Sequence, residues 1–480
     1  MPVRSLTEAL PAAWTRGEIS VVGLARSGRA AAELLARAGA PVYASDAGTG
    51  DAVQHAMRAL APLGVAVQSA GHDLARIAAS AVVVASPGVP PDAPPLRAAR
   101  EAGRTIVSEL EIALQFLPGQ RYVAITGTNG KTTTTALVHT LFEGLGYDSV
   151  AAGNIGTPLA EVALRAEAPD WIALETSSFQ LHDTPSIHPA AGVLTNLSAN
   201  HLDRYATVDE YFGDKALLFR NAGARSVWVS NADDPDVQAM VAMVPGHHLR
   251  FTTAQGAAEG YYDRAGDRLV VLGESLIARN ELTLLGDHNV ANALAASLAV
   301  MLANENHRTP EALGAIARGL RSFRALEHRI ETVGEIDGVL WINDSKSTNV
   351  ASTEVALRGM TSPTVLLLGG KHKGEAYTPL SDELRRTVKL VLAYGEAAPL
   401  IESDLGGVVP VERLGSSFDE IIAEARRSAS PGDVVLLSPA CSSYDMFDNY
   451  EHRGREFKRL AHEASPLASE GGHTPRQKSQ

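Results

Sequence analysis

The chain reads Val123-Ala-Ile-Thr-Gly127-Thr-Asn-Gly130-Lys131-Thr132-Thr133, so an apolar strand runs directly into a loop that ends in Lys-Thr. Small residues in such a loop let backbone N–H groups approach an anion closely. Lys131 supplies a mobile positive charge for outer phosphates, and Thr132 can offer a hydroxyl to Mg²⁺. The stretch therefore predicts an α/β domain that binds a nucleoside triphosphate, ATP or GTP.

This phosphate loop departs from the usual spacing. The common pattern has a glycine five residues before Gly130, and this chain has Ile125 there, which leaves a shortened loop. An ordinary strand-to-helix turn rich in small residues is the alternative. If the loop binds phosphates, its contacts come from Gly127, Thr128, Asn129, Gly130, Lys131, Thr132 and Thr133.

Composition narrows the class of protein. At 480 residues the chain is too long for one hydrophobic core, and domain-size statistics favour roughly three domains. Its 45% hydrophobic and 20% charged residues are ordinary for a soluble globular enzyme, and no run of roughly 18 apolar residues is present to span a bilayer. The net charge of -13 and the lack of a Lys/Arg block give no support to nucleic-acid binding.

The start of the chain and its cysteine content indicate a cytoplasmic protein. Residues 1–8 include an acidic side chain and no unbroken apolar run, which argues against a secretory signal. The single cysteine, Cys441, excludes an intramolecular disulfide and suits a reducing compartment.

Three series of alternating strand and helix patterns predict three α/β domains. The predicted strands are 19–22, 41–46 and 81–84, then 123–126, 171–174, 192–195 and 226–230, and finally 338–342, 365–368, 390–394 and 434–437. We expect a Rossmann-like domain over 1–109, a central phosphate-loop domain with a mainly parallel sheet over 110–325, and a second Rossmann-like domain over 326–465. The Ser/Gly/Glu/Lys-rich residues 466–480 predict a disordered tail.

A glycine turn also follows the first predicted strand. Gly23-Leu-Ala-Arg-Ser-Gly28 precedes an alanine-rich helix, and Asp46 lies 18 residues after Gly28, at the end of the next strand. A dinucleotide fingerprint has another glycine where this chain has Ala25, which disfavours NAD. The turn either binds a different nucleotide through the helix N-terminus and Asp46, or it is purely structural.

Polar residues follow the predicted strands of the central series. Glu175 comes directly after a strand and is well placed to hold Mg²⁺ beside a γ-phosphate, or it is an ordinary surface carboxylate. His201 follows the next strand and is either a metal ligand or structural. Lys215 has the pattern of a helix-surface lysine. Asn289 and Asn292 share a helix face, where they could read an adenine edge or cap a helix.

Two segments of the third series place charges after strands. Trp341-Ile-Asn-Asp344-Ser-Lys346-Ser-Thr348-Asn349 gathers a carboxylate, a cation and hydroxyls, which favours a ligand site over a simple turn. Leu366-Leu-Leu-Gly-Gly-Lys371-His-Lys373 brings basic groups that suit a carboxylate or a phosphate. Cys441 has no evident activating base, so a catalytic thiol is not expected.

Together these segments resemble the Mur ligase family, from about residue 19 to residue 462. The family-level signals are Thr126–Thr133, Gly153-Asn154-Ile-Gly156, Glu175-Thr-Ser-Ser-Phe-Gln180, His201-Leu-Asp-Arg-Tyr205 and His288-Asn289. The stretches that resemble the glutamate-adding member are Trp341–Asn349 and Ser438–Phe447, followed by Tyr450 and Arg453-Gly454. The Asp-Asn-Pro-Arg motif of the member that adds diaminopimelate or lysine is not found in the chain.

The resemblance implies an ATP-dependent amide ligase of cytoplasmic peptidoglycan precursor synthesis. ATP would phosphorylate the carboxylate of UDP-N-acetylmuramoyl-L-alanine, and the amine of D-glutamate would attack the acyl phosphate to give an amide, ADP and phosphate. A monomer is implied, without nucleic-acid partners or membrane insertion, whose third domain closes to assemble the site. The alternatives are L-glutamate with the same acceptor, glutamate addition to folate, which the C-terminal stretches oppose, and a non-catalytic phosphate-loop nucleotide-binding regulator.

The resemblance also implies a role for each matching residue. Lys131 would steady the phosphates, and two Mg²⁺ ions would be held by Thr132, Glu175, His201 and a carbamylated Lys215, which replaces the surface interpretation of that lysine. ATP would further contact Asn292, Arg329 and Asp344. The UDP-linked substrate would contact Ser27, Asp46, Ser86, Gly88, Asn154, Ser177 and Gln180. Glutamate would bind Lys373, Ser443 and Tyr450, with Lys371 as the alternative to Lys373.

Overall fold

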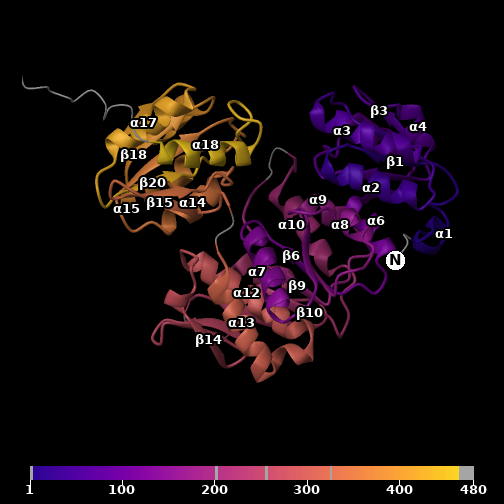
Figure 1. Cartoon of the computed structure of the whole chain (residues 1–480), viewed down its shortest axis with the longest axis horizontal. Coiled ribbons are helices and arrows are strands. Elements are labelled where there is room, and N and C mark those ends of the chain that lie inside the picture. The colour runs from indigo at the N-terminus through magenta and orange to yellow at the C-terminus, as the bar shows by residue number, and fades with distance from the viewer. Residues whose placement is uncertain (1–3, 201–203, 255–257, 325–326, 464–480) are drawn as a thin grey trace, which may run out of the picture. The chain divides into compact units, whose positions relative to one another are not determined.

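The computed structural model describes residues 4–200, 204–254, 258–324 and 327–463. The chain divides into two compact units (Figure 1), of which the larger is Met1–Thr283 with Asp287–Phe323 and the smaller is Leu284–Gly286 with Arg324–Gln480. The expected tail 466–480 and the candidate ligand His201 lie outside the described residues. The division into three domains at 109 and 325 stays a prediction.

The N-terminal sheet of the larger unit has five parallel strands in the order β3-β2-β1-β4-β5. They are β1 Ile19–Val22, β2 Val42–Ser45, β3 Ala66–Gln68, β4 Val82–Ala85 and β5 Ile106–Ser108. Val21 and Val22 enter different apolar clusters on the two faces, as expected for a parallel sheet covered by helices on both sides. The covering helices are α1 Leu6–Ala9, α2 Arg26–Arg37, α3 Asp51–Leu60, η1 Ala61–Leu63, α4 Leu74–Ala79, α5 Pro94–Glu101 and α6 Glu109–Phe116.

The second sheet of the larger unit has nine strands in the order β14-β13-β12-β11-β10-β9-β6-β8-β7. They are β6 Tyr122–Thr126, β7 Ser149–Gly153, β8 Trp171–Glu175, β9 Ala191–Leu194, β10 Val227–Asn231, β11 His247–Thr252, β12 Gly260–Asp263, β13 Arg268–Val271 and β14 Glu274–Ala278. Strands β6 to β12 pair in parallel, whereas β12, β13 and β14 form an antiparallel end that the sequence patterns had not indicated.

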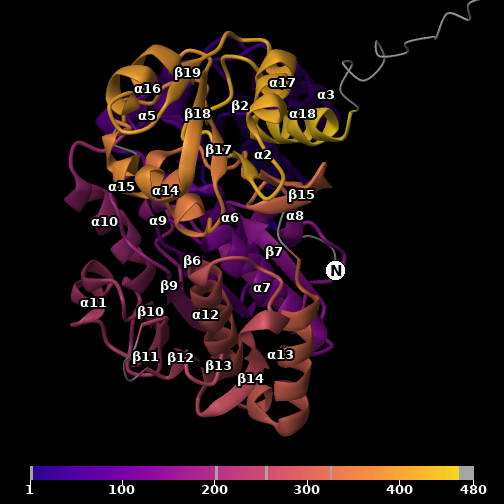
Figure 2. The ribbon, with the colours of Figure 1, turned by 90° about the vertical axis from the view of Figure 1, so that its left-hand side faces the viewer.

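Helices pack on this nine-stranded sheet, and α7, α12 and α13 lie side by side (Figures 1 and 2). The first part of the helix set is α7 Lys131–Gly144, α8 Leu159–Ala163, α9 Ser178–His182, α10 Val208–Ala216 and η2 Leu217–Phe219. The remainder is α11 Pro235–Val241, η3 Arg279–Glu281, α12 Asp287–Ala303, η4 Glu305–Arg308 and α13 Pro310–Ser322. Because α12 is apolar nearly all round, it is buried along most of its length.

The smaller unit contains a six-stranded sheet in the order β15-β16-β20-β17-β18-β19, in which only the β15–β16 pair is antiparallel among the described strands. Its strands are β15 Glu331–Ile336, β16 Val339–Asn343, β17 Thr364–Gly369, β18 Val388–Tyr394, β19 Val411–Arg413 and β20 Val434–Leu437. Its helices are α14 Val350–Arg358, η5 Thr378–Leu380, α15 Ser381–Thr387, α16 Ala398–Leu405, α17 Phe418–Ser428 and α18 Tyr450–His462. Leu366 and Leu367 of β17 enter separate clusters on opposite faces.

The predicted α/β class with three mainly parallel sheets is confirmed. Strand β6 lies between β9 and β8, and all three run in the same direction. The phosphate loop, Glu175 and the residues after β9 therefore meet at one edge of the sheet, where ligands of open α/β sheets bind. Within the described part of the chain, no helix is both long and apolar enough to cross a membrane.

Candidate active site

Two glycines fix the shape of the phosphate loop between β6 and α7. Gly127 and Gly130 have φ angles of 143° and 80°, which disfavour any residue with a side chain. A Cβ at Gly127 would lie 2.0 Å from Thr195 Oγ1, and one at Gly130 would lie 2.4 Å from Asn292 Oδ1. Backbone conformation and close packing thus both require glycine here.

The loop is held from the end of β9 by a residue to which the sequence had given no role, Asn196. Its Oδ1 accepts the Asn129 N–H at 2.8 Å, and its backbone oxygen accepts the Thr128 N–H at 2.9 Å. The hydroxyl of Thr195 donates to the Asn129 oxygen at 2.6 Å. These contacts preorganise the loop, and the only sequence signal for them was the position of Asn196 directly after a predicted strand.

Two lysines converge on one carbonyl of the loop. Lys131 Nζ donates to the oxygens of Gly127 and Thr128 at 3.0 and 2.7 Å, and Lys215 Nζ donates to Gly127 O at 2.7 Å. Lys215 comes from α10 and is only 1% exposed, so the surface interpretation from its helical pattern was wrong. Burial, and secondarily the charge of Lys131, lower the pKa of Lys215 well below its usual value.

Glu175 ends β8 and is 2% exposed, so the alternative of a surface carboxylate was also wrong. Its Oε1 accepts a hydrogen bond from Asn154 Nδ2 at 2.8 Å. Its Oε2 is buried and has no hydrogen-bond partner among the described residues. A buried carboxylate oxygen costs free energy unless it is paired or coordinates a cation. The Glu175 side chain therefore fits a metal ligand.

The structure describes only some of the other residues that were predicted to bind metal. Thr132 is the second residue of α7 and is buried. His201 cannot be placed, because it lies outside the described residues. No group of three or more His, Cys, Asp or Glu side chains that could hold a metal occurs in the described part of the chain. The expected set combines a hydroxyl, a carboxylate, a modified lysine and His201, so its described members would not form such a group.

Asn292 of α12 packs against the phosphate loop. Its Oδ1 accepts a hydrogen bond from Thr134 Oγ1 at 3.2 Å, and its Nδ2 donates to Asn289 Oδ1 at 3.0 Å. The two asparagines thus share a helix face, as their spacing had indicated. Asn292 joins α12 to α7 beside Gly130, close to the predicted nucleotide site.

At the start of α9, Ser177 and Gln180 form a reciprocal cap. Ser177 Oγ accepts the Gln180 N–H at 3.2 Å, and Gln180 Oε1 accepts the Ser177 N–H at 3.0 Å. Gln180 Nε2 is buried and makes no hydrogen bond within the described structure. A buried amide donor without an acceptor costs free energy, so the Gln180 side chain is held at a cost to stability.

In the N-terminal sheet, Asp46 and Ser86 stabilise the turn after β1. The two carboxylate oxygens of Asp46 accept the N–H groups of Leu24 at 2.6 Å and Gly48 at 2.7 Å. Ser86 Oγ donates to Gly23 O at 2.8 Å. The structural alternative for this turn is therefore supported, and binding of a ligand by these residues remains a prediction, as it does for Ser27 and Gly88.

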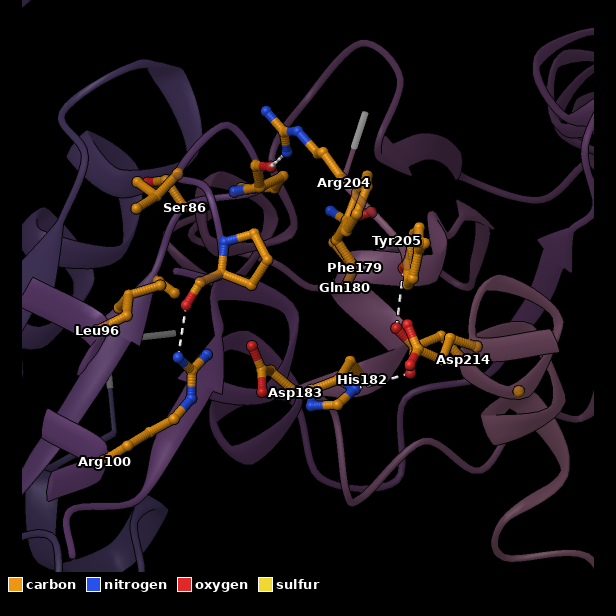
Figure 3. A pocket seen from close by; sticks show the side chains of 16 residues that line it. Ser86, Leu96, Arg100, Phe179, Gln180, His182, Asp183, Arg204, Tyr205 and Asp214 are labelled. Atoms are coloured by element: carbon orange, nitrogen blue, oxygen red, sulfur yellow. Dashed lines mark hydrogen bonds and ion pairs between the residues drawn. The ribbon is translucent and has the colours of Figure 1, made fainter. Parts of the chain in front are cut away.

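A cavity of about 390 Å³ lies between the elements after β4 and those of the nine-stranded sheet (Figure 3). Ser86, Leu96 and Arg100 line one side. The other side is lined by Gln180 of α9, by Asp183 directly after that helix and by Asp214 of α10. Burial raises the pKa of Asp183 to about 6. Two predicted substrate residues, Ser86 and Gln180, thus border one cavity.

In the smaller unit, Asp344 follows β16 and is buried. Its Oδ2 accepts hydrogen bonds from the hydroxyls of Ser347 at 2.5 Å and Ser438 at 2.8 Å, and its Oδ1 accepts the Ile330 N–H at 3.2 Å. Burial raises the pKa of Asp344 to about 6, although these donors and Arg329 oppose the shift. Asp344 therefore joins the motif after β16 to the motif after β20.

Of the residues predicted to bind glutamate, Ser443 and Tyr450 follow β20, whereas Lys373 lies in the loop after β17. Lys373 Nζ donates to Thr348 Oγ1 at 3.2 Å, whereas the backbone of Lys371 pairs with Ser442. Ser443 is buried beside that pairing. Tyr450 begins α18, and its backbone oxygen accepts the Ser345 hydroxyl at 2.8 Å.

The buried guanidinium of Arg453 connects the motif after β16 to the motif after β20. It donates to Ser345 Oγ at 2.9 Å and to Ser345 O at 2.8 Å, and to the oxygens of Cys441 and Ser442 at 3.2 and 3.5 Å. The sequence had singled out Arg453 only as part of a motif. Cys441 is buried, and burial raises the pKa of its thiol to about 11, in line with the expectation that it is not a nucleophile.

Family models match three consecutive parts of the chain. Residues 17–108 match the "Mur ligase MurD-like, N-terminal domain", residues 125–300 match the "Mur ligase middle domain", and residues 328–441 match the "Mur ligase, glutamate ligase domain". Similar solved structures include MurF from Acinetobacter baumannii, with a TM-score of 0.60, 14% identity and coverage of 96% of this chain and 100% of that chain. MurF from Thermotoga maritima in complex with ADP gives a TM-score of 0.57 at 16% identity, over 94% of this chain and 99% of that one. These structural likenesses support the fold.

Curated relatives cover nearly the whole chain. A protein of Chromobacterium violaceum is 42% identical over 447 residues, which are 92% of this chain and 96% of the relative. Proteins of Geotalea uraniireducens and Salinibacter ruber are each 40% identical, over 92% and 93% of this chain and 96% and 97% of their own lengths. All three relatives are named UDP-N-acetylmuramoylalanine--D-glutamate ligase. This chain therefore belongs to the Mur ligase family, and within it most resembles the UDP-N-acetylmuramoylalanine--D-glutamate ligases.

Proposed function

We propose that this chain is an ATP-dependent ligase that joins D-glutamate to UDP-N-acetylmuramoyl-L-alanine through an acyl phosphate, in peptidoglycan precursor synthesis. The observation that carries the proposal is the charge arrangement at the phosphate loop. Two buried or half-buried lysines meet at Gly127 O, and the buried carboxylate of Glu175 has an oxygen without a partner among the described residues. An anionic carboxylate can approach a γ-phosphate only where such groups neutralise charge. The names of the relatives supply the substrates.

The phosphate loop performs the first half of the proposed reaction. The N-terminal turn of α7, from Gly130 to Thr133, and the Lys131 ammonium bind the phosphates of ATP and orient the γ-phosphate. Bound Mg²⁺ would supply further charge neutralisation, and the residues that would hold it are Thr132, Glu175 and Lys215 as a carbamate. His201, which lies outside the described residues, is assigned to a second ion by the resemblance alone. An oxygen of the acceptor carboxylate then forms a bond to the γ-phosphorus as the bond to ADP breaks. The amine of D-glutamate next attacks the acyl carbon and expels phosphate.

The state of Lys215 supports its proposed carbamylation. A lysine reacts with CO₂ only as the neutral amine, and burial together with Lys131 favours that form. The nitrogen forms a bond to the carbon of CO₂ and loses a proton, which yields an anionic carbamate. The carbamate oxygens can then ligate Mg²⁺, whereas an ammonium group cannot. The neighbouring Lys131 charge, which opposes an ammonium at Lys215, favours an anion there.

We assign the remaining substrate contacts by the same resemblance. The acceptor binds through Ser27, Asp46, Ser86, Gly88, Asn154, Ser177 and Gln180, and two of these border the cavity of Figure 3. Glutamate binds through Lys373, Ser443 and Tyr450. The remaining contacts to ATP come from Asn292, Arg329 and Asp344. The bond from Lys373 Nζ to Thr348 Oγ1, in the motif after β16, supports Lys373 as the residue for the glutamate carboxylate, and Lys371 stays the alternative. We place the enzyme in the cytoplasm as a monomer, where ATP and the UDP-linked acceptor are available.

The function is tested by ADP release from the full-length chain with ATP, Mg²⁺ and UDP-N-acetylmuramoyl-L-alanine. D-glutamate, L-glutamate and no amino acid are compared, and the amide product is identified by mass. We expect turnover only with D-glutamate, and loss of turnover in Lys131→Ala. Preference for L-glutamate would change the assigned substrate. Nucleotide binding without amino-acid-dependent turnover would overturn the enzyme assignment in favour of a regulator.

A further inference from the structure

The carboxylate of Asp214 joins three segments of the larger unit. His182, the last residue of α9, donates from Nδ1 to Asp214 Oδ1 at 2.7 Å. Tyr205 donates its hydroxyl to Asp214 Oδ2 at 2.8 Å. Asp214 itself lies on α10. Figure 3 shows His182 and Tyr205 on either side of this carboxylate, so both of its oxygens are used in cross-links between segments.

A ring stack closes this cross-link into a loop of contacts. Phe179 of α9 stacks on Tyr205, with ring centroids 5.2 Å apart and planes 13° apart. The contacts therefore run from Phe179 to Tyr205, to Asp214, to His182 and back along α9. We call these four residues the Asp214 ring. Two aromatic faces and two charge-assisted hydrogen bonds make it a more rigid connection than any one contact would be.

Arg204 connects the Asp214 ring to the turn after β4. The Arg204 guanidinium lies over the Phe179 ring, 5.0 Å from its centroid. Its two terminal nitrogens donate to the oxygens of Pro87 at 3.2 Å and Gly88 at 3.1 Å. The turn assigned to the UDP-linked substrate is thus connected through Arg204 to α9.

The next residue after Asp214 is Lys215, which faces the phosphate loop. Consecutive residues of an α-helix point about 100° apart, so one helix turn presents Asp214 to α9 and Lys215 to Gly127. Helix α10 has only 9 residues, too few to be stable without tertiary contacts. A cross-link at Asp214 therefore sets both the position and the rotation of the turn that carries Lys215.

We infer that Asp214 is a positioning residue of this enzyme: through His182 and Tyr205 it holds α10 against α9 and so keeps Lys215 at the phosphate loop. The significance of Lys215 rests on the proposed function, whereas the mechanical link does not. Other charged groups face the same pair, namely Asp183 and Arg100 near His182 and the Lys215 amine near Asp214. The link itself depends on the two hydrogen bonds of Asp214, which an amide side chain can also make with neutral His182.

Hydrogen exchange of the full chain without nucleotide tests the mechanical part. Asp214→Ala removes both hydrogen bonds, and we expect peptides that cover residues 208–219 to exchange about tenfold faster than in the wild type. Asp214→Asn, which keeps two hydrogen bonds, should stay within about threefold of the wild type. Asp209→Ala, on the exposed first turn of the same helix, is the matched control and should leave these peptides unchanged.

Steady-state kinetics tests the consequence for the reaction. Asp214→Ala should lower kcat about tenfold while the KM for ATP stays within about twofold, because Lys215 is displaced whereas the loop keeps its bonds to Thr195 and Asn196. Asp214→Asn should retain most of kcat, because it keeps the hydrogen bonds. If the charge of the carboxylate were what matters, this variant would lose kcat as Asp214→Ala does. If Asp214→Ala does not fold, two other variants replace it in the same exchange and kinetic measurements. Tyr205→Phe and His182→Ala each remove one of the two hydrogen bonds of Asp214.

Unchanged exchange over 208–219 and unchanged kcat in Asp214→Ala, or in both single-bond variants, would overturn the inference. The two proposals fail separately. If the wild type shows no turnover with D-glutamate but the exchange pattern is as expected, the assigned reaction is wrong and the mechanical link stands. If the wild type turns over but residues 208–219 exchange at the same rate in Asp214→Ala as in the wild type, Asp214 does not position α10.

Discussion

At the scale of single residues, the physical state of Lys215 follows from its surroundings rather than from its helix. Burial and the charge of Lys131 lower its pKa, and they outweigh Glu175 and Asp214, which act in the opposite direction. The helical pattern indicated an exposed lysine, because the periodicity of a sequence shows which residues share a helix face. It does not show that another segment, here the phosphate loop, covers one of those residues. Only the resemblance to a family pointed to this residue from the sequence.

Replacing Lys215 should therefore remove activity in a way that a carboxylic acid can partly restore. We expect Lys215→Ala to lower kcat roughly a hundredfold, because the site loses an anionic metal ligand. Bicarbonate with a short-chain acid such as propionate should recover part of the rate by filling the space with a carboxylate. ADP release measured with and without these additions checks the result.

Lys215→Arg is the matched variant, since it keeps a positive charge but cannot form the carbamate. It should be as inactive as Lys215→Ala, and the added acid should not restore it. Full activity of the arginine variant, or a rate in Lys215→Ala equal to that of the wild type, would show that no carbamate is needed at this position.

At the scale of elements, strands such as β1, β6, β8, β17 and β20 could be predicted because each is a short apolar or β-branched run bounded by turn residues. Strands β3, β5 and β19, with 3 residues each, were not predicted, because so short a run shows no alternating pattern. The parallel arrangement of β6, β8 and β9 then brings Glu175 to the phosphate loop without further information. The antiparallel strands β13 and β14 were not predicted either, and their length is not the reason, because they have 4 and 5 residues, as β1 and β6 do. The Asp214 ring was also not predicted, since no spacing in the sequence links His182, Tyr205 and Asp214.

The junction of α6 and α8 contains a carboxyl group whose protonation should affect stability. Glu109, the first residue of α6, is fully buried, accepts the Ala160 N–H at 2.5 Å through Oε1, and has no partner for Oε2 within the described residues. Burial raises its pKa from 4.5 to about 8, with a smaller contribution from Glu161. The folded state therefore binds this proton more tightly than the unfolded state, and stability falls as pH rises from about 4.5 to 8.

Glu109→Gln should remove that pH-dependent loss, because glutamine keeps the acceptor for Ala160 and carries no charge. The difference in unfolding free energy between variant and wild type should grow in favour of the variant by at least about 1.4 kcal/mol from pH ~5 to pH ~8. This amount is equivalent to one pKa unit. Thermal or urea unfolding of both proteins across this range measures the difference. Glu101→Gln, at an exposed position of α5, is the control. A stability difference that does not change with pH would contradict the assignment of the buried proton to Glu109.

At the scale of the whole molecule, the family resemblance and the relatives agree along nearly the full length of the chain. The three mainly parallel sheets are those expected from the sequence, and about 40% identity extends over 92% of the chain. The predicted site residues are divided between the units: the phosphate loop and Asn292 belong to the larger, and Arg329, Asp344 and Lys373 to the smaller. The sequence could name these residues through motifs, but it could not show which of them also stabilise their own unit, as Asp344 does.

The fate of the acceptor's carboxylate oxygen tests most directly whether this chain activates a carboxylate with ATP. The acceptor UDP-N-acetylmuramoyl-L-alanine, labelled with heavy oxygen in its alanine carboxylate, is incubated with the full chain, ATP, Mg²⁺ and D-glutamate, and the released phosphate is analysed by mass spectrometry. We predict that each phosphate carries a single labelled oxygen, because the carboxylate oxygen that attacks the γ-phosphorus leaves with the phosphate when the amide forms. Release of unlabelled phosphate together with amide would contradict an acyl phosphate at this site.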